Sequence, residues 1–322
     1  MYARLKQVGE KFRLAGELYA YEPITMGNIN STYKVTYDKG EGVLKAYLFQ
    51  RVNTHVFKNP VEIMENIDHV TSHIRKKCPE QVTLHYHHTD EGLNYYVCEE
   101  DAFWRVVNYV DSVTFNSCED MHVIEVTGKA FGQFQTRLSD FDGDVLHETI
   151  SDFHNTLKRL DTFFAHVEED VCGRVAEVEA EIAYIASVRE KACELSVRFA
   201  NGEIPKRVTH NDTKCNNVLF DRMTKEPIVV IDLDTIMPGM SIYDFADGVR
   251  FIGNSSVEDE QDVSKVYFDT EKFRAFARGF IQGTEGALEP VGIENLVKGT
   301  FSVEPFPWKT CHYYRACVQI IG

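Results

Sequence analysis

A run of polar residues at fixed spacing lies between two short apolar segments in the second half of the chain. Asp212 is followed two residues later by Lys214 and five residues later by Asn217. The apolar segment 218–220 comes next, and a second apolar segment ends at Asp232. Short apolar runs bounded by turn residues predict buried strands. The chain is therefore expected to fold here as a loop and a strand end that present a carboxylate, a cation, an amide and a second carboxylate.

These groups fit the chemistry of phosphoryl transfer. Their spacing is that of the catalytic loop and the metal-binding aspartate in protein-kinase-like phosphotransferases. The reaction needs an oriented acceptor hydroxyl, Mg²⁺ against the phosphates and cations near the moving group. We expect Asp212 to orient the hydroxyl or accept its proton, and Lys214 to face the γ-phosphate. Asn217 and Asp232 offer the oxygen atoms that a hard cation prefers. The alternative is a polar loop whose Asp and Asn residues only form turns.

The remainder of the chain changes from a β-rich pattern to a helical one near residue 112. The first part predicts a hairpin around the turn at 38–42, a helix after Asn59, and strands at 82–86, 93–98 and 103–110. The second part predicts helices, the clearest with an apolar stripe over 175–195 and another at 272–280. We therefore predict a two-lobed α+β fold, with an N-lobe at 1–112, a C-lobe at 113–322 and a nucleotide in the cleft between them.

Composition narrows the classes of partner. The 322 residues include 50 Asp and Glu against 34 Lys and Arg, a net charge of −16 that disfavours nucleic acids and anionic membranes. No segment approaches the ~20 apolar residues that span a bilayer, and the N-terminus lacks the apolar core of a signal peptide. The eight cysteines form no zinc-like pattern, which indicates reduced thiols in the cytoplasm. The expected partner is a small molecule, with no obligate protein partner.

Longer runs of sequence resemble a known family. The chain resembles the aminoglycoside-phosphotransferase-like kinases, which share the protein-kinase fold, and within them it is most similar to the bacterial N-acetylhexosamine 1-kinases. The resemblance covers about residues 20–285 and is carried by residues 27–33, 49–53, 104–106, 130–135, 208–219, 231–239, 243–250, 262–268 and 273–276. The loop at 210–217 alone indicates only a kinase, and the longer runs favour the sugar kinases.

The resemblance implies ATP, Mg²⁺ and transfer of the γ-phosphate to the anomeric hydroxyl of N-acetylglucosamine or N-acetylgalactosamine. It gives the catalytic role to Asp212 and the metal to Asn217 and Asp232, while Asp234 is a further metal ligand or a structural carboxylate. Asp244 and Arg250 resemble the residues that support the catalytic loop. The residues expected to contact the nucleotide are Gly27, Asn28, Asn30, Thr32 and Gln50. The cation that grips the α- and β-phosphates stays open, because Lys45, Gln50 and Arg51 all lie on the candidate strand.

Two other functions stay open alongside the sugar kinase. One is a related kinase for homoserine, choline or an aminoglycoside, because an acidic protein suits a cationic acceptor. The other is an inactive nucleotide-binding remnant. The segment from about residue 290 departs from the family's pattern of further helices, with Pro305 and Pro307 close together. That departure favours a truncated or frame-shifted gene product with an incomplete acceptor site.

Overall fold

The computed structural model describes residues 1–25, 29–98, 101–256 and 260–303, which fall into two compact units. The first unit contains Met1–Ser112 together with Val145–Ile150 and Leu233–Ile236, and the second contains the rest of the chain. The sequence predicted a single boundary at residue 112, which would instead assign Val145–Ile150 and Leu233–Ile236 to the C-lobe. Among the described helices, none combines the length and the apolar character that crossing a membrane requires.

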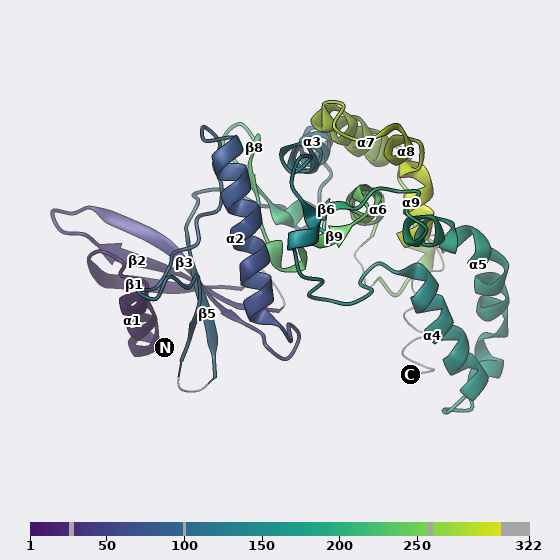
Figure 1. Cartoon of the computed structure of the whole chain (residues 1–322), viewed down its shortest axis with the longest axis horizontal. Helices are drawn as coiled ribbons and strands as arrows, with labels where there is room; N and C mark the ends of the chain where they lie inside the picture. The colour runs from purple at the N-terminus through teal and green to yellow at the C-terminus, as the bar shows by residue number, and fades with distance from the viewer. Residues whose placement is uncertain (26–28, 99–100, 257–259, 304–322) are drawn as a thin grey trace. The chain divides into compact units, whose positions relative to one another are not determined.

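A five-stranded antiparallel sheet forms most of the first unit (Figure 1). The hairpin expected from the turn at 38–42 is present, with Thr32 opposite Gln50, and the next strand brings Arg105 opposite Gln50 on the other side. The strand order is β1-β2-β3-β5-β4. The strands are β1 (Glu17–Ile24), β2 (Ser31–Asp38), β3 (Leu44–Val52), β4 (Tyr96–Val97) and β5 (Phe103–Asn108), and the helices are α1 (Tyr2–Lys11) and α2 (Pro60–Lys77).

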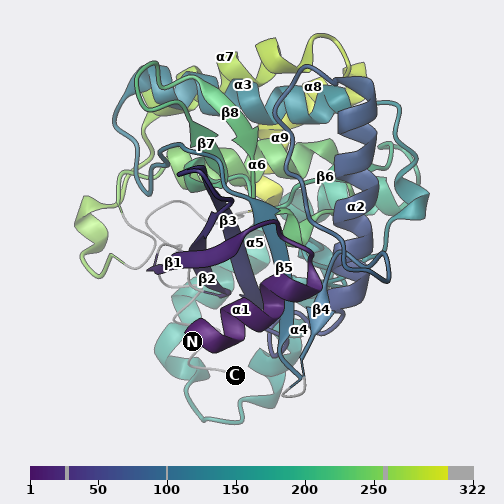
Figure 2. The ribbon, with the colours of Figure 1, turned by 90° about the vertical axis from the view of Figure 1, so that its left-hand side faces the viewer.

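The two faces of this sheet carry different residues. Figure 2 shows α1 lying across the strands, and its apolar side chains join Val35, Phe49 and Val106 in one buried core. Side chains alternate between the faces of a strand, so Gln50 and Arg105 point to the opposite face. There Arg105 Nη1 lies 3.8 Å from Met64 Sδ of α2. The sheet therefore turns an apolar face to α1 and holds a polar pair on the other.

The predicted strand at 82–86 is wrong. Only Tyr86 pairs, in an isolated bridge with Val107, and the strand predicted at 93–98 is reduced to Tyr96–Val97. The segment instead runs as a loop whose backbone bonds β5 at single points, such as His87 N to Val106 O at 2.8 Å. Alternating apolar residues predicted a strand here, but the side chains alone do not specify a continuous ladder.

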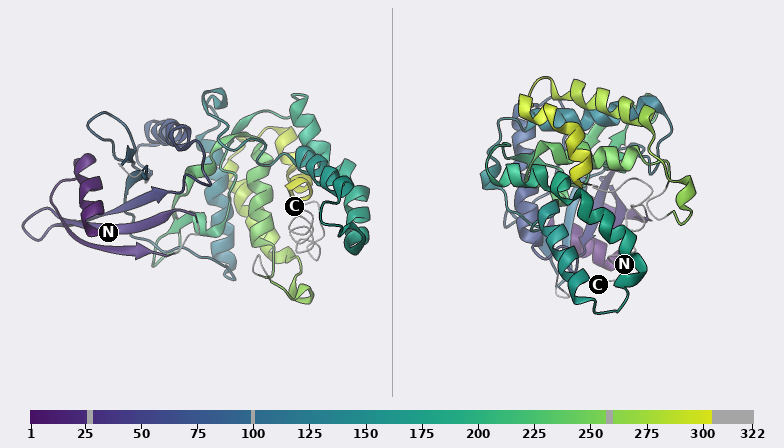
Figure 3. Two further views of the ribbon diagram at one scale, coloured as in Figure 1. Left: turned by 90° about the horizontal axis from the view of Figure 1, so that it is seen from below. Right: turned by 90° about the vertical axis from the view of Figure 1, so that its right-hand side faces the viewer.

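The second unit is mainly helical, and Figure 3 shows it from two further directions. Its two small antiparallel ladders pair β6 (Arg207–Thr209) with β9 (Met237–Gly239) and β7 (Val218–Phe220) with β8 (Pro227–Val230). The helices predicted at 175–195 and 272–280 are both present. The helices are α3 (Met121–Arg137), α4 (Thr156–Glu169), η2 (Val175–Val178), α5 (Glu179–Ala200), α6 (Ser241–Ile252), η5 (Val263–Lys265), α7 (Thr270–Thr284), α8 (Pro290–Glu294) and α9 (Leu296–Val303). The predicted lack of further helices after about residue 290 is wrong for residues 290–303, which contain α8 and α9. The rest of the predicted abnormal tail, residues 304–322, lies outside the described residues.

Helices α3 and α7 pack with their backbones in close approach, and Figures 1 and 2 both show them side by side. Glycines line the contact from both helices. A Cβ atom at Gly128 would overlap the carbonyl oxygen of Phe276, and one at Gly279 would overlap that of Glu125. The contact fixes α3, which carries Thr127 and Gln135 toward the candidate site described below.

We expect Gly279→Ala to lower the free energy of unfolding by about 1–3 kcal/mol, because neither backbone can retreat without opening the helix contact. The matched control is Gly143→Ala, where the nearest atoms to an added Cβ lie at an ordinary 3.8 Å. Urea denaturation of both variants measures the difference. Equal stability of the two variants would contradict the close approach.

Candidate active site

The predicted catalytic loop connects two short strands in the second unit. It follows β6 (Arg207–Thr209), which pairs with β9 (Met237–Gly239), and it leads through η3 (Cys215–Asn217) into β7 (Val218–Phe220). Strand β7 pairs with β8 (Pro227–Val230), the strand that precedes Asp232. The two ladders thus fix both ends of the loop, as the apolar runs in the sequence predict.

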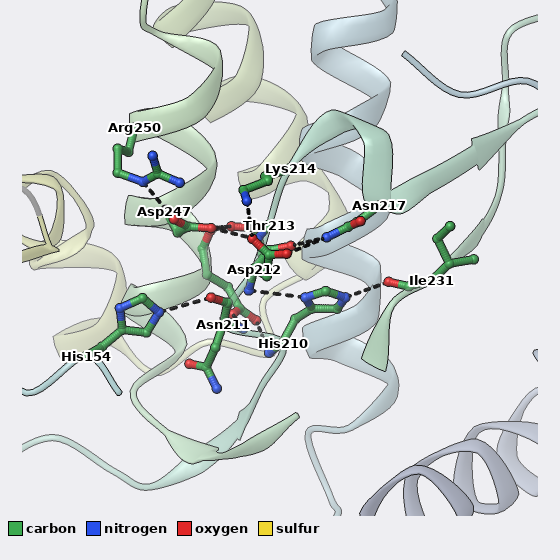
Figure 4. Close-up of polar contacts among 11 residues, drawn as sticks. His154, His210, Asn211, Asp212, Thr213, Lys214, Asn217, Ile231, Asp247 and Arg250 are labelled. Carbon is green, nitrogen blue, oxygen red and sulfur yellow. Dashed lines mark hydrogen bonds and ion pairs between the residues drawn. The ribbon is translucent and has the colours of Figure 1, made fainter. Parts of the chain in front are cut away.

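Asp212 is the centre of the loop's polar contacts (Figure 4). Asn217 Nδ2 donates to the Asp212 carboxylate at 2.9 Å and to its backbone carbonyl at 2.8 Å. Lys214 Nζ lies 3.0 Å from the other carboxylate oxygen, and the side chains of Asp212 and Lys214 are each 27% exposed. The carboxylate is therefore oriented by an amide and a cation but still accessible to a small molecule. Three of the residues predicted to act together do lie together.

A buried carboxylate from α6 holds the backbone of the same loop. Asp244, with no exposed surface, accepts hydrogen bonds from the backbone N–H groups of His210 at 3.0 Å and Asn211 at 2.8 Å. Gln135 of α3 donates to the same carboxylate at 2.5 Å. Burial raises the pKa of the Asp244 carboxyl, and these donors together with the nearby His210 act in the opposite direction. The contacts make Asp244 a support for the loop, as the resemblance implies.

A second buried carboxylate, Asp247, lies one turn further along α6. It accepts from the Thr213 N–H at 2.7 Å and from Arg250 Nε at 2.9 Å. Burial pushes the pKa of Asp247 upward, but Arg250 and His154 together hold that pKa below its ordinary value. Arg250 thus supports the loop through Asp247, and Asp244 acts separately rather than as its direct partner.

Two histidines complete the frame around the loop (Figure 4). His210 Nε2 donates to the Ile231 carbonyl at 2.9 Å, and its Nδ1 accepts from the Asp212 N–H at 3.3 Å. The ring therefore ties the loop to the residue before Asp232. His154 Nε2 donates to the Asn211 carbonyl at 3.0 Å, and burial lowers the pKa of His154.

Asp232 itself stands at an unusual backbone position. Its φ is +59°, and Asn211 at the other end of the frame has φ +67°. Non-glycine residues adopt this left-handed region at a cost, and such residues cluster at functional sites. The Asp232 side chain is exposed just beyond β8. The strand ends at Val230, two residues before the strand end that was predicted at Asp232, so the bend takes Asp232 out of the strand.

The first unit brings together a different part of the predicted site. Arg105 and Asp234 form a buried ion pair, with side chains 1% and 2% exposed, in which both guanidinium Nη atoms donate to the carboxylate. Asn30 Nδ2 also donates to this carboxylate, at 2.8 Å. Arg105 Nε donates to Gln50 Oε1 at 3.0 Å, and Gln50 Nε2 donates to Thr32 Oγ1 at 3.2 Å. Four of the predicted site residues therefore belong to one chain of hydrogen bonds.

This chain of contacts changes the reading of two predictions. Asp234 was expected as a metal ligand or a structural carboxylate, and its oxygens are already occupied by Arg105 and Asn30. In protein kinases a lysine on the third strand pairs with a helix glutamate. Here that strand carries Gln50, and the buried cation is Arg105 on the neighbouring β5. Lys45, at the other end of β3, lies over the Tyr47 ring instead.

Two predicted nucleotide contacts, Gly27 and Asn28, lie outside the described residues. The sequence reasoning also missed several residues that the structure places at these sites. Asp247 had a signal, because Asp244, Asp247 and Arg250 follow one another at three-residue spacing on one helix. The roles of Arg105 and His154 could not be predicted, because their partners lie far along the chain. The side chains missed are Arg105, His154 and Asp247.

Several solved structures with a similar fold are kinases or phosphotransferases of small molecules. The microcompartment-associated aminopropanol kinase is 14% identical over 99% of this chain and 94% of its own, with a TM-score of 0.63. An aminoglycoside phosphotransferase from Alicyclobacillus acidocaldarius is 15% identical over 98% of this chain and 89% of its own, with a TM-score of 0.60. A spectinomycin phosphotransferase, solved with ADP and spectinomycin, is 14% identical over 99% of this chain and 88% of its own, with a TM-score of 0.56. These likenesses confirm the kinase-like α+β fold.

The sequence itself matches a family over most of its length. Residues 20–280 match the phosphotransferase enzyme family. This range includes the whole of the loop from His210 to Asn217, both supporting carboxylates of α6 and the Arg105–Asp234 pair. The chain is therefore an enzyme that belongs to the phosphotransferase enzyme family.

Proposed function

We propose that this enzyme transfers the γ-phosphate of ATP to the anomeric hydroxyl of an N-acetylhexosamine, either N-acetylglucosamine or N-acetylgalactosamine. The observation that carries the reaction class is Asp212, fixed by Asn217 and Lys214 in a loop whose backbone is held by buried carboxylates. The choice of acceptor rests on the sequence runs that resemble the sugar 1-kinases. ATP is the donor by the same resemblance, and a related phosphotransferase was solved with ADP.

In this proposal Asp212 orients the acceptor hydroxyl and takes its proton as the phosphoryl group is transferred. The transition state of phosphoryl transfer is loose, so positioning and electrostatic stabilisation matter more than strong base catalysis. Asn217 Nδ2 and Lys214 Nζ hold the carboxylate from two sides, which fixes its direction. Lys214 also supplies positive charge beside the group being transferred. No covalent enzyme intermediate is needed.

The residues present fit one divalent cation bound by oxygen. Asn217 donates through Nδ2 to Asp212, which leaves its Oδ1 on the opposite side of the amide. Asp232 adds an exposed carboxylate after the bend at the end of β8. We assign Mg²⁺ to these two residues and assign Asp234 to the ion pair with Arg105. Bound Mg²⁺ would neutralise phosphate charge. Asn30, Thr32 and Gln50 are proposed as the nucleotide-side residues of the first unit.

A related small-alcohol kinase is the second candidate. The similar solved structures include an aminopropanol kinase, a spectinomycin phosphotransferase and an aminoglycoside phosphotransferase. The net charge of −16 also suits a cationic acceptor such as choline, an aminoglycoside or the amino group of homoserine. The inactive remnant is the third possibility from the sequence, and the intact contacts of Asp212 argue against it.

Phosphorus NMR of the purified protein with Mg-ATP and both N-acetylhexosamines tests the proposal. The expected result is a sugar 1-phosphate signal, split by the anomeric proton, that grows as ADP forms. Omitting either the sugar or Mg²⁺ should abolish it. A new phosphoester only with an aminoglycoside, choline or homoserine would replace the sugar proposal with the second candidate. Stabilisation by Mg-ATP without turnover of any acceptor would indicate the remnant.

A further inference from the structure

The peptide group that joins Asn211 to Asp212 is hydrogen-bonded by an imidazole at each of its two polar ends (Figure 4). His154 Nε2 donates to its carbonyl oxygen at 3.0 Å. His210 Nδ1 accepts from its N–H group at 3.3 Å. A peptide group is planar, so these two contacts fix the orientation of one rigid unit. That orientation helps to set the direction in which the Asp212 side chain leaves the loop.

The backbone of Asn211 depends on such contacts, because its φ of +67° lies in the left-handed region. A residue other than glycine keeps this conformation only where its surroundings impose it. Asp244 holds the N–H group of Asn211 at 2.8 Å, and His154 holds its carbonyl oxygen. Loss of the His154 bond would leave the N–H side held and give the carbonyl side, which leads into Asp212, more freedom to rotate.

The chain around His154 fixes the position of its ring. His154 lies in a turn before α4, closed by the Asn155 N–H group, which donates to the Asp152 carbonyl at 3.0 Å. The Asn155 side chain also donates to the Asp152 carboxylate at 2.9 Å. The imidazole contacts two aromatic rings, with centroids 4.7 Å from Phe153 and 5.0 Å from Tyr243 of α6. The turn and the two rings together direct Nε2 toward the loop.

The aromatic surroundings do not explain why this ring is polar. A carbonyl oxygen only accepts hydrogen bonds, so His154 Nε2 carries the proton and Nδ1 is left as an acceptor. Nδ1 is buried and has no hydrogen-bond partner among the residues that the structure describes. A buried acceptor without a partner costs free energy, which an apolar ring of similar size would avoid. The bond from Nε2 to the loop is therefore the contact that requires a histidine.

We propose that His154 is a positioning residue for phosphoryl transfer, acting on Asp212 through the Asn211–Asp212 peptide. The inference rests on the proposed role of Asp212 toward the acceptor hydroxyl. Small displacements of a reacting group lower rates strongly, because the group no longer meets the substrate in the productive geometry. The contact acts on the carboxylate and not on a bound substrate, so its loss should lower kcat and leave KM unchanged.

The wild-type protein tests the hydrogen bond directly. A long-range nitrogen–proton NMR spectrum of the histidine rings shows which ring nitrogen carries the proton, and the His154 signals are assigned by their absence from the spectrum of His154→Gln. We expect the His154 proton on Nε2 and a bare Nδ1. A neutral ring with its proton on Nδ1 would overturn the proposal, because Nε2 could then not donate to the Asn211 carbonyl.

Steady-state kinetics test the effect on catalysis, with whichever acceptor the wild type phosphorylates. We expect His154→Phe, which keeps a ring but removes the donor, to lower kcat about tenfold, the size of effect expected for one hydrogen bond. The KM values for ATP and the acceptor should stay near those of the wild type. His154→Gln should recover most of the rate, because its side-chain N–H group can reach the same carbonyl. The matched control is His166→Phe, at an exposed histidine of α4, which should keep the wild-type rate.

Two kinetic outcomes would overturn the positioning role. One is equal kcat for His154→Phe and His166→Phe, and the other is an equal loss in His154→Phe and His154→Gln, which would assign the effect to the ring and not to the donor. His154→Leu takes the place of His154→Phe if circular dichroism shows that the latter does not fold. If the wild type phosphorylates no acceptor, the proposed function fails. The backbone amide signals of Asn211 and Asp212 then decide the positioning, since they should shift in His154→Phe and return in His154→Gln, and unchanged signals would overturn it.

Discussion

Replacing Asp212 with Asn is expected to lower kcat by about 10²–10⁴-fold, the usual range for losing a general base. The amide cannot take the proton of the acceptor hydroxyl. The substitution also removes the ion pair with Lys214. The N–H₂ group of the new amide would face Asn217 Nδ2 or Lys214 Nζ, and both of these are themselves donors. The affinity for ADP should change little, because the proposed role lies with the acceptor. Steady-state turnover and calorimetric titration of ADP measure the two effects.

Asp161→Asn is the matched control for Asp212→Asn. It also removes a carboxylate that pairs with a cation, Arg189, but at an exposed position on α4. Exposed ion pairs contribute about 0–1 kcal/mol, so kcat and stability should stay near those of the wild type. A kcat for Asp212→Asn within threefold of the control, about 0.65 kcal/mol in barrier height, would remove Asp212 from the catalytic role.

Replacing Arg105 with Met is expected to lower the free energy of unfolding by about 3–5 kcal/mol, the cost of leaving one member of a buried ion pair uncompensated. The Asp234 carboxylate would lose both donated bonds from the guanidinium and keep the one from Asn30. Gln50 would lose its bond from Arg105 Nε at the same time. Urea denaturation, followed by circular dichroism, measures the loss.

The double variant Arg105→Met, Asp234→Leu should recover most of that stability, since apolar residues of similar volume often replace a buried ion pair without loss. Arg189→Met, at the exposed pair with Asp161, is the control and should cost little. Losses that simply add in the double variant would contradict a direct pairing. If the double variant keeps its affinity for Mg-ADP, the result supports the role of Asp234 in the ion pair. If it loses as much Mg-ADP affinity as Asp232→Asn does, Asp234 is a metal ligand instead.

The sequence predicted local features well. The hairpin around residues 38–42 formed as expected, because a turn signal between two apolar alternating segments leaves few other pairings. The helices at α2, α5 and α7 follow from their apolar stripes. In the site, Asp212, Lys214 and Asn217 lie together because they belong to one short loop. Their spacing alone restricts how far apart their side chains can lie.

The failures concern features that depend on distant partners. The strand predicted at 82–86 has the right composition but makes only the Tyr86 bridge. Asp234 has the same local context as Asp232, two residues away, yet it pairs with Arg105, 129 positions earlier in the chain. The apolar residues on both sides of Arg105 indicate a buried strand, but they do not show which residue pairs with its guanidinium. Burial makes the pair, and one sequence does not show which residues are buried together.

The sequence by itself determined the reaction class, because the chemical groups of the catalytic loop and their offsets are set by the covalent chain. Only the tertiary structure decided how that loop is held, with Asp244 and Asp247 of α6 bonding its backbone from more than 30 positions away. It also decided that Asp234 joins Arg105. Contacts of this kind arise from the packing of elements that are distant in the chain, and their energy depends on burial that no local pattern records.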